Sequence, residues 1–423
     1  MTILPAPKAA LFHPVRSPPT VSRVIIVSDF CDLQGGQAKV AIDSARLLAE
    51  AGYDVIFFGA SGVPDPRLDH PKIRVVGLGQ VPLANGGLRV ALAGLWNGTA
   101  ATELRDLITT EAGQGTVVHV HGFAKALSPA IGPVLATAPV PVIYTLHEYF
   151  LACPNGGFFD YQERRICTRM PMSAACIMAH CDARQRSHKA YRLLRQIILH
   201  RVGKLPQSLC HIVVLTERQR QIMAGHLPKN AQLHLLANPV TSPPKSPNTR
   251  SRSGPFAFVG RLSPEKGAPL FARAAALAKV PAMFIGDGAD AAAVRSANPD
   301  AEITGWLAHS DVHERLSQAR ALVLPSLWYE CQPLVMLEAL SMGVPVVAGR
   351  WISGTDCITD GVNGVLFDNP EPEPLAAALQ VAQTIPDFDP APFRARFAPT
   401  AHLSGLLDIY QNALHKYLHE KAY

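Results

Sequence analysis

Short apolar runs alternate with longer helical patterns along most of the chain. In the first half, β-branched and apolar runs predict strands at 23–28, 54–58, 73–76, 116–120, 140–146 and 211–215. Helix-forming sequence follows the first run from about Gln37 to Ala51, where Gly52 ends it. The second half repeats the alternation, with strands predicted near Phe256, Ala282, Ala301, Ala321 and Pro345. Strands that alternate with helices predict parallel sheets covered on both faces, which is an α/β fold.

The chain is long enough for two such units. Its 423 residues provide ample sequence for two cores. Residues 239–254 are rich in Pro, Ser, Thr and Lys, which predicts a linker. We therefore expect one domain over 21–238 and another over 255–399. The proline-rich segment 1–20 is expected to be a flexible tail, and the leucine spacing over 400–423 predicts a C-terminal helix.

Composition narrows the class of protein. No run of about 18 apolar residues occurs, so we expect no membrane-spanning helix. Eight cysteines without a secretory signal favour a reducing cytoplasm. The net charge of +6 is modest, so its distribution matters more than its total.

Two carboxylates lie eight residues apart around a predicted helix start in the second half. Pro333 suits the first helical turn, which places Glu330 in the preceding loop and Glu338 on the second turn. The free backbone N–H groups of Leu334 and Val335 favour an anion in front of the helix. The carboxylates can accept hydrogen bonds from sugar hydroxyls, and the N–H groups at the helix start can bind phosphate. A nucleotide sugar carries both kinds of group. For this window alone, a solvated amphipathic helix is the alternative.

A second polar segment follows the strand near Phe256. Gly260 breaks that strand, and Arg261 and Lys266 leave its carboxyl end, where ligands collect in open α/β sheets. A guanidinium and an ammonium could neutralise a diphosphate without a metal. Two solvated cations in a loop are the plainer interpretation.

Together these segments resemble the family 4 glycosyltransferases of the GT-B fold. The matching pieces are G-R-L-x-x-x-K-G at 260–267, I-G-D-G at 285–288, E-x7-E at 330–338, and the apolar run 339–347. The resemblance is specific over about 150 residues of the second half and looser in the first. It implies two Rossmann-like domains facing each other across a cleft, with the C-terminal helix crossing back to the first domain.

The resemblance also implies roles for individual residues. Arg261 and Lys266 would hold the diphosphate, Glu330 the sugar hydroxyls, and Glu338 the ribose. His147, in the segment T-L-H-E-Y at 145–149, would lie close to the donor sugar and the acceptor. The expected catalytic residues are Arg261, Lys266, Glu330 and His147. The expected substrate-binding residues are Gly35, Gly36, His121, Gly260, Gly288, Leu307, Leu334, Val335 and Glu338.

Two of these positions also follow from the first strands. Gly35-Gly36 comes after the first strand, where glycine lets backbone approach a diphosphate or sugar closely, although an ordinary strand-to-helix turn explains it too. We expect His119 and His121 to point to opposite faces of their strand. His121, at the carboxyl end, would then line the cleft.

A loop in the first domain holds four cysteines within thirty residues, Cys153, Cys167, Cys176 and Cys181. Four soft ligands can bind a structural zinc ion. The spacing lacks C-x2-C pairs, so free thiols and disulfide or redox chemistry remain open. Catalysis by this fold requires no cofactor, so no catalytic metal is expected.

Basic residues concentrate between Arg184 and Lys204, with apolar residues at helical spacing among them. A basic amphipathic helix can lie on an anionic membrane surface, whereas a core helix with one cationic face is the alternative. No nucleic-acid-binding pattern accompanies the charge. We therefore expect a cytoplasmic protein, peripheral on the inner face of the cell membrane, with a saccharide or lipid-linked saccharide acceptor.

The predicted function is retaining transfer of a sugar from a nucleotide-diphosphate sugar to an acceptor hydroxyl, in cell-surface polysaccharide or glycoconjugate synthesis. Family members often carry Phe-Gly where Cys331-Gln332 stands here, which leaves the donor sugar open. A nucleotide-sugar epimerase of the same fold and a non-catalytic sugar- or lipid-binding protein are the alternatives.

Overall fold

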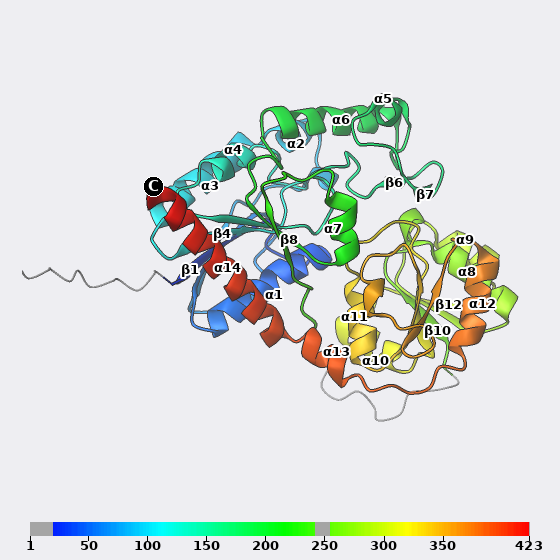
Figure 1. Cartoon of the computed structure of the whole chain (residues 1–423). Coiled ribbons are helices and arrows are strands. Elements are labelled where there is room, and N and C mark those ends of the chain that lie inside the picture. Colours follow the sequence, from blue (N-terminus) through cyan, green and yellow to red (C-terminus); the bar gives the residue numbers. More distant parts are fainter. Residues whose placement is uncertain (1–19, 242–253, 423) are drawn as a thin grey trace, which may run out of the picture.

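The computed structural model describes residues 20–241 and 254–422. The predicted tail over 1–20 lies outside this range except for Thr20, as does most of the predicted linker over 239–254. Within the described residues the chain forms two parallel sheets with helices on both faces, side by side (Figure 1). The strands of one sheet lie before residue 236 and those of the other after residue 255.

Seven parallel strands form the first sheet, in the order β3-β2-β1-β4-β5-β8-β9. Their bounds are β1 Arg23–Phe30, β2 Asp54–Ser61, β3 Ile73–Gly77, β4 Thr116–Val120, β5 Val142–Thr145, β8 His211–Val214 and β9 Gln232–Leu235. Strands are added toward one edge of the sheet from β1 to β3 and toward the other edge from β4 onward. The order therefore reverses between β1 and β4, and ligands bind at such switch points. Apolar side chains from both faces of β1 are fully buried, which explains its unbroken hydrophobic run.

The second sheet repeats this topology with six parallel strands in the order β12-β11-β10-β13-β14-β15. They are β10 Phe256–Val259, β11 Ala282–Ile285, β12 Glu302–Gly305, β13 Ala321–Leu324, β14 Val346–Gly349 and β15 Gly364–Phe367. Its switch point lies between β10 and β13. Two Rossmann-like units of this kind are the expected GT-B architecture.

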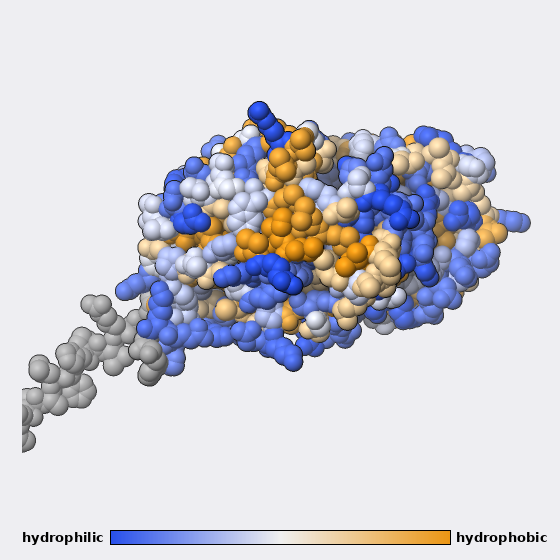
Figure 2. Space-filling model, turned by 90° about the horizontal axis from the view of Figure 1, so that it is seen from above, coloured by the Kyte–Doolittle hydropathy of each residue, from blue (hydrophilic) through white to orange (hydrophobic). Residues whose placement is uncertain are grey.

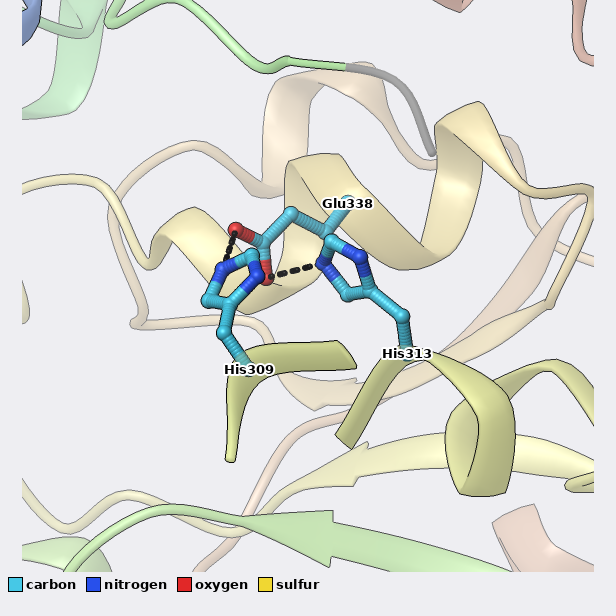
Figure 3. A group of neighbouring side chains, drawn as sticks. All are labelled: His309, His313 and Glu338. Atoms are coloured by element: carbon cyan, nitrogen blue, oxygen red, sulfur yellow. Dashed lines mark ion pairs between the residues drawn. The ribbon is translucent and has the colours of Figure 1, made fainter. Parts of the chain in front are cut away.

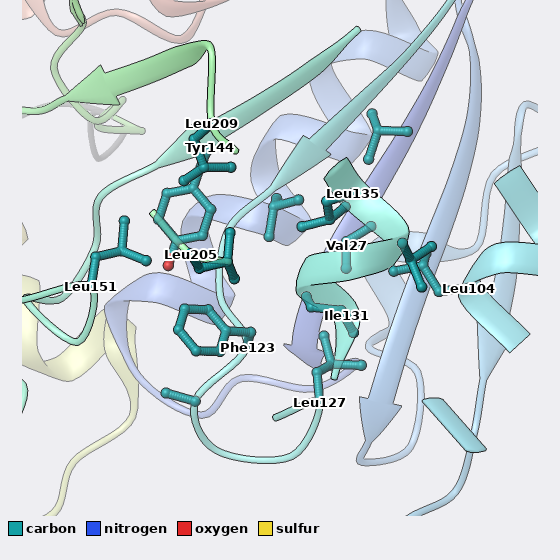
Figure 4. Packing of buried hydrophobic residues seen from close by; sticks show 14 of the residues in the cluster. Val27, Leu104, Phe123, Leu127, Ile131, Leu135, Tyr144, Leu151, Leu205 and Leu209 are labelled. Carbon is teal, nitrogen blue, oxygen red and sulfur yellow. The ribbon is translucent and has the colours of Figure 1, made fainter. Parts of the chain in front are cut away.

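Helices cover both sheets. Those of the first unit are α1 Gly36–Glu50, α2 Leu88–Leu95, α3 Gly98–Glu111, α4 Ile131–Ala136, α5 Ala174–Met178, α6 Arg186–Arg201 and α7 Glu217–Met223. Those of the second are α8 Ala268–Ala278, α9 Ala291–Ala297, α10 His309–Ser317, α11 Leu334–Ser341, α12 Pro372–Ala382 and α13 Ala391–Arg396. One face of the first sheet packs under α3 and α4 in an apolar core that includes Phe123, Ile131 and Leu104 (Figure 4).

The last helix, α14 Pro399–Ala422, returns to the first unit. It runs alongside α1 (red beside blue in Figure 1). Leu406, Tyr410 and Leu414 are buried with Val24 and Ile26 of β1 in one core cluster. The Tyr410 hydroxyl also lies 2.7 Å from His119 Nδ1 on β4. The C-terminal helix therefore crosses back to the first domain, as the resemblance implies.

Two strands escaped the sequence pattern. β9 has the sequence Q-L-H-L and β15 the sequence G-V-L-F, and both form an edge of their sheet. The side chains of β9 are exposed or half-buried, so its hydrophobic signal is weak, whereas β15 is mostly buried but only four residues long. A two-stranded antiparallel ribbon, β6 Phe159–Asp160 with β7 Arg165–Ile166, was not predicted either.

Candidate active site

Lys266 and Glu330 are brought together from segments 64 residues apart. Lys266 ends a short 3-10 turn after β10, and its Nζ donates to Glu330 Oε1 at 2.7 Å. The Ser326 hydroxyl donates to the same oxygen at 2.8 Å. Burial acts to raise the pKa of Glu330, but the charge and hydrogen bond of Lys266, together with the side chains of Ser326 and Trp328, outweigh it and the pKa is lowered. The carboxylate is therefore ionised and fixed at the switch point of the second sheet.

The Glu330 backbone is held in an uncommon conformation. Its φ of 54° lies in the left-handed region, which long side chains seldom adopt. Tyr149 from the first unit donates its hydroxyl to the Glu330 carbonyl at 2.6 Å. The second unit holds the side chain of this residue and the first unit holds its carbonyl. Contacts from both units therefore stabilise the strained backbone.

Arg261 follows β10 on the same loop as Lys266. Its guanidinium is exposed, with Nη2 lying 3.2 Å from Glu265 Oε1. Glu265 is buried and also accepts a hydrogen bond from the Ser263 hydroxyl at 2.7 Å, so it fixes the loop through its buried side chain. The exposed fork of Arg261 remains available to a ligand, which suits the predicted diphosphate contact.

Glycines permit the tight turns around these cations. Gly288, with φ of 156°, lies so close to the loop after β10 that a Cβ there would sit 2.4 Å from the Leu262 carbonyl oxygen. Gly260, with φ of 145°, ends β10 itself, and a Cβ on the neighbouring Gly286 would sit 2.1 Å from its carbonyl oxygen. Close backbone approach thus accounts for the predicted glycines.

Helix α11 starts directly across from the first unit. A Cβ on Gly36 would lie 3.4 Å from Leu334 Cδ1, so the Gly35-Gly36 turn faces the first residue of α11. Gly35 has φ of 93° and is the N-cap residue directly before α1. The Met336 N–H bonds to the Pro333 carbonyl, so the N–H groups of Leu334 and Val335 precede the first bonded turn. The predicted phosphate-facing residues of both units therefore share one place in the structure.

Glu338 lies on the second turn of α11 as predicted. It is buried, and two imidazoles from α10, those of His309 and His313, approach its carboxylate. Burial acts to raise the pKa of Glu338, but these imidazoles lower it to about 2. Further along, Leu307 is half-buried in the core beneath α10, and the neighbouring Trp306 is 68% exposed at the end of β12.

Three histidines of the first unit, His119, His121 and His147, form a compact group that we call the histidine cluster. His121 Nδ1 lies 2.9 Å from His147 Nε2, and the rings of His119 and His121 have centroids 4.1 Å apart. The prediction that His119 and His121 point to opposite faces is therefore wrong. Side chains two positions apart on an extended chain share a face, so both point to the same side.

Acidification below neutral pH is expected to destabilise the fold through these histidines. Burial lowers the pKa of His147 to about 3 and that of His402, beside the cluster, to about 4; the pKa values of His119 and His121 are also lowered. The unfolded chain then binds more protons below pH about 6.5, so the free energy of unfolding falls with pH. Each buried neutral histidine contributes up to about 1.4 kcal/mol per pH unit.

Urea midpoints measured at pH 7.5, 6 and 5 check this expectation. Asp29, whose pKa burial raises, acts in the opposite direction, so a decrease must come from the histidines. The carboxylates with lowered pKa values, Glu330, Glu338, Asp65 and Glu217, weaken the fold only at lower pH. His402→Gln should reduce the slope. A midpoint that stays constant from pH 7.5 to 5 contradicts the prediction.

Several side chains near the cleft were not predicted. Lys125 forms an ion pair with Glu148, which directly follows His147. Asp29, at the end of β1, is fully buried and accepts from the N–H groups of Ala126 and Leu127 at 2.8 and 3.0 Å. These contacts fix the loop after β4. A carboxylate near the carboxyl end of a mostly apolar strand was the available signal for Asp29.

The side chain of Gln332 bridges the two units. Its Oε1 accepts from the Asn238 N–H at 2.7 Å, and its Nε2 donates to the Leu215 carbonyl at 3.3 Å. Cys331 packs against the first core. The departure from the family pattern at Cys331-Gln332 thus holds the units together, while its predicted bearing on the donor sugar stays a prediction.

The four-cysteine loop contains a buried ammonium. Lys189 Nζ lies 3.1 Å from Cys181 Sγ and 3.7 Å from Cys176 Sγ, while Arg169 Nη1 lies 3.6 Å from Cys167 Sγ. All four thiols are free. Cations beside the thiols disfavour a divalent ion in this arrangement. Structural zinc at this loop stays a prediction, which metal analysis of the purified protein tests.

Comparison with known proteins agrees with this geometry. Residues 255–383 match the model of the family described as glycosyl transferases group 1, and residues 35–239 match that of the glycosyl transferase 4-like domain. A GDP-mannose-dependent alpha-mannosyltransferase of Corynebacterium glutamicum is 33% identical over 111 residues, 26% of this chain and 27% of that protein. The aligned stretch thus spans about a quarter of this relative's length.

Solved structures share the fold over nearly the whole chain. Sucrose-phosphate synthase from Thermosynechococcus elongatus superposes with a TM-score of 0.64 at 17% identity, covering 93% of this chain and all of that one. Anabaena HepE in complex with UDP gives 0.59 at 15% identity, covering 92% and 99%. Both halves of the sequence and the whole architecture lead to the same assignment: the chain belongs to the family 4 glycosyltransferases of the GT-B fold.

Proposed function

We propose that this protein transfers a glycosyl unit from a nucleoside diphosphate sugar to an acceptor hydroxyl, with retention of anomeric configuration. The observation that carries the proposal is the 2.7 Å contact between Lys266 and Glu330. It places a cation for the diphosphate beside a carboxylate for sugar hydroxyls. A relative that uses GDP-mannose and a structural neighbour that binds UDP support a nucleotide sugar as donor.

Charge stabilisation is the main chemical contribution of the site. As the bond from sugar to diphosphate breaks, negative charge grows on the leaving group, and Arg261, Lys266 and the start of α11 can neutralise it. Glu330 would accept hydrogen bonds from donor hydroxyls. His147 is neutral at pH 7 and can exchange hydrogen bonds with sugar hydroxyls without adding charge. The acceptor hydroxyl would enter from the first unit.

Incubation with a panel of nucleotide sugars, read by release of the nucleoside diphosphate, tests the proposal. GDP-mannose and UDP-hexoses come first, each with and without an acceptor extract. Acceptor-dependent release and a glycosylated product are expected. Conversion of the donor sugar into an epimer without acceptor would favour an epimerase. Failure to bind any donor would favour a non-catalytic binding protein.

The surface of α2 and α6 supports association with an anionic membrane. Apolar residues on these two helices, and Trp96 directly after α2, are 40–78% exposed: Leu88, Leu92, Trp96, Leu194 and Ile197. The helices contact each other through the Tyr191 hydroxyl, which donates to the Ala91 carbonyl at 2.8 Å. Figure 2 looks onto this end of the molecule and shows apolar side chains gathered among hydrophilic ones. Of the basic residues in and beside α6, Arg184, Arg186 and Arg201 are exposed, whereas Lys189 and Arg195 are buried.

Membrane association would bring a lipid-linked saccharide to the cleft from the side of the first unit. No described helix has the length and apolar character of a membrane span. Apolar contact plus basic residues can hold a protein at an interface.

Co-sedimentation with liposomes of increasing anionic lipid content checks this association. We expect binding to rise with anionic lipid and to fall at least fivefold in a Leu92→Asp, Ile197→Asp double variant. Leu277→Asp, at a residue 56% exposed on α8, is the matched control and should bind as the parent does. Binding that does not depend on anionic lipid, or that survives the double substitution, removes the membrane proposal.

A further inference from the structure

Two imidazoles and a carboxylate converge beside the start of α11. His309 and His313 are four residues apart on α10, so both rings leave the same face of that helix. Figure 3 shows both rings pointing to the carboxylate of Glu338 on α11. One ligand atom from each side chain lies within 4.8 Å of the others. Across residues 20–241 and 254–422, no other three His, Cys, Asp or Glu side chains form such a group.

The distances suit ligands around an ion better than direct hydrogen bonds. His309 Nε2 lies 3.5 Å from Glu338 Oε1, and His313 Nε2 lies 3.7 Å from Oε2. An N–H···O hydrogen bond is normally about 2.7–3.2 Å. Zinc bonds of about 2.0–2.2 Å place two ligands of a tetrahedral ion about 3.3–3.6 Å apart. The separations of 3.5 and 3.7 Å, to the two oxygens of Glu338, lie at or just above that range, and one ligand atom from each of the three side chains lies within 4.8 Å of the others.

His313 provides a second, independent observation. Its Nε2 is buried and has no hydrogen-bond partner among the described residues. A buried polar atom without a partner is uncommon in folded proteins and costs free energy. This nitrogen points to the Glu338 carboxylate across the space that separates the two side chains. Coordination of an ion in that space would use the unsatisfied lone pair.

We propose that His309, His313 and Glu338 form a binding site for a divalent transition-metal ion of the zinc type. Two imidazoles with one carboxylate suit zinc, cobalt and nickel, whereas magnesium and calcium prefer oxygen ligands only. Three protein ligands leave a coordination position open to solvent or another ligand. His309 is 60% exposed in its side chain, so an ion can enter from solvent.

The consequence for catalysis rests on the proposed function. Glu338 is the carboxylate expected to accept hydrogen bonds from the donor ribose. A carboxylate that coordinates an ion has its lone pairs engaged, and the ion with its open ligand position occupies the space beside it. The metal ion therefore competes with the donor, and zinc inhibits by weakening donor binding.

Metal titration of the full chain tests the site without reference to activity. Protein stripped with a chelator is titrated with Co²⁺ and followed by visible absorption, with Zn²⁺ displacement as confirmation. We expect saturable binding that His309→Asn and His313→Asn each weaken at least tenfold, because each removes one of three ligands. His415→Asn, at an exposed histidine on α14, is the matched control and should bind as the parent does.

The cobalt spectrum separates this site from the cysteine loop. Thiolate ligands give cobalt an intense near-ultraviolet charge-transfer band, which imidazole and carboxylate ligands do not. Binding without that band, lost in the histidine variants, supports the proposal. Binding that carries the band or is unchanged in both variants overturns it, as does the absence of binding.

A second measurement tests the competition. Affinities for GDP and UDP are determined by calorimetry with and without saturating Zn²⁺. We expect zinc to weaken the nucleotide that binds at least tenfold in the parent, and not in the His309→Asn, His313→Asn double variant. That variant also controls for zinc bound to nucleotide in solution. Unchanged nucleotide affinity overturns the competition, whereas the absence of nucleotide binding without zinc counts against the proposed function and leaves the cobalt result standing.

Discussion

Replacing Lys266 by alanine is expected to lower kcat by about 10²–10³-fold, because preorganised charge on a leaving group contributes on this scale. Lys266 is the cation that the structure fixes beside Glu330, at 2.7 Å. The loss should lie mainly in kcat, since the charge on the diphosphate grows as the bond to the sugar breaks. Steady-state kinetics with the donor found in the panel measure it. Arg273→Ala on α8 is a matched cation control.

The same substitution should weaken the fold. Removing one partner of a buried ion pair costs about 3–5 kcal/mol, and the cost here should lie at or below the lower end because Lys266 is partly exposed and Ser326 still binds Glu330. A Lys266→Met, Glu330→Gln double variant removes both charges and should recover most of that free energy of unfolding while remaining inactive. If Lys266→Ala retains more than a third of the parental kcat, its catalytic assignment is wrong.

Glu330→Gln is expected to lower kcat/KM for the nucleotide sugar by about 10–10²-fold, while the free nucleoside diphosphate binds with nearly parental affinity. A hydrogen bond from a substrate hydroxyl to a charged group contributes about 1.5–3 kcal/mol, and the glutamine keeps the size of the side chain. Calorimetry with the diphosphate and kinetics with the donor separate the two effects.

The contrast between donor and diphosphate makes this test specific. Glu338→Gln serves as the comparison. The Glu338 carboxylate is assigned to the ribose, so this substitution should weaken the binding of both the nucleotide sugar and the nucleoside diphosphate. A Glu330→Gln variant that lost affinity for the diphosphate as well would place its role on the phosphate rather than on the sugar. Full activity in Glu330→Ala would remove Glu330 from the site altogether.

Local sequence carried much of the fold and part of the site. The central strands are buried on both faces, so their unbroken runs of Val and Ile were readable without knowledge of their neighbours. Arg261, Lys266 and Glu330 lie in segments with specific spacing, and the structure gathers them at one switch point. The edge strand Gln232–Leu235 has two apolar residues in four, which is too weak a pattern to predict.

Contacts between distant segments could not be predicted. The Tyr149 hydroxyl binds a backbone carbonyl 181 residues later, and no side-chain pattern encodes an acceptor on the backbone. The group of His309, His313 and Glu338 joins two helices whose orientation depends on the packing of the whole second unit. The histidine faces were mistaken for a different reason, since the pairing of His119 with His121 follows directly from strand geometry.

The return of α14 to the first sheet also affects the order in which the two units can complete their folding during synthesis. The second unit has its buried residues in place once Phe397 is made. The first unit, although synthesised earlier, has α1 packed on β1 but completes the cluster around Val24 and Ile26 only once Leu406, Tyr410 and Leu414 are made. The N-terminal unit therefore cannot complete this core before the second unit is made, and the apolar surface that α14 later covers is exposed to aggregation in the meantime.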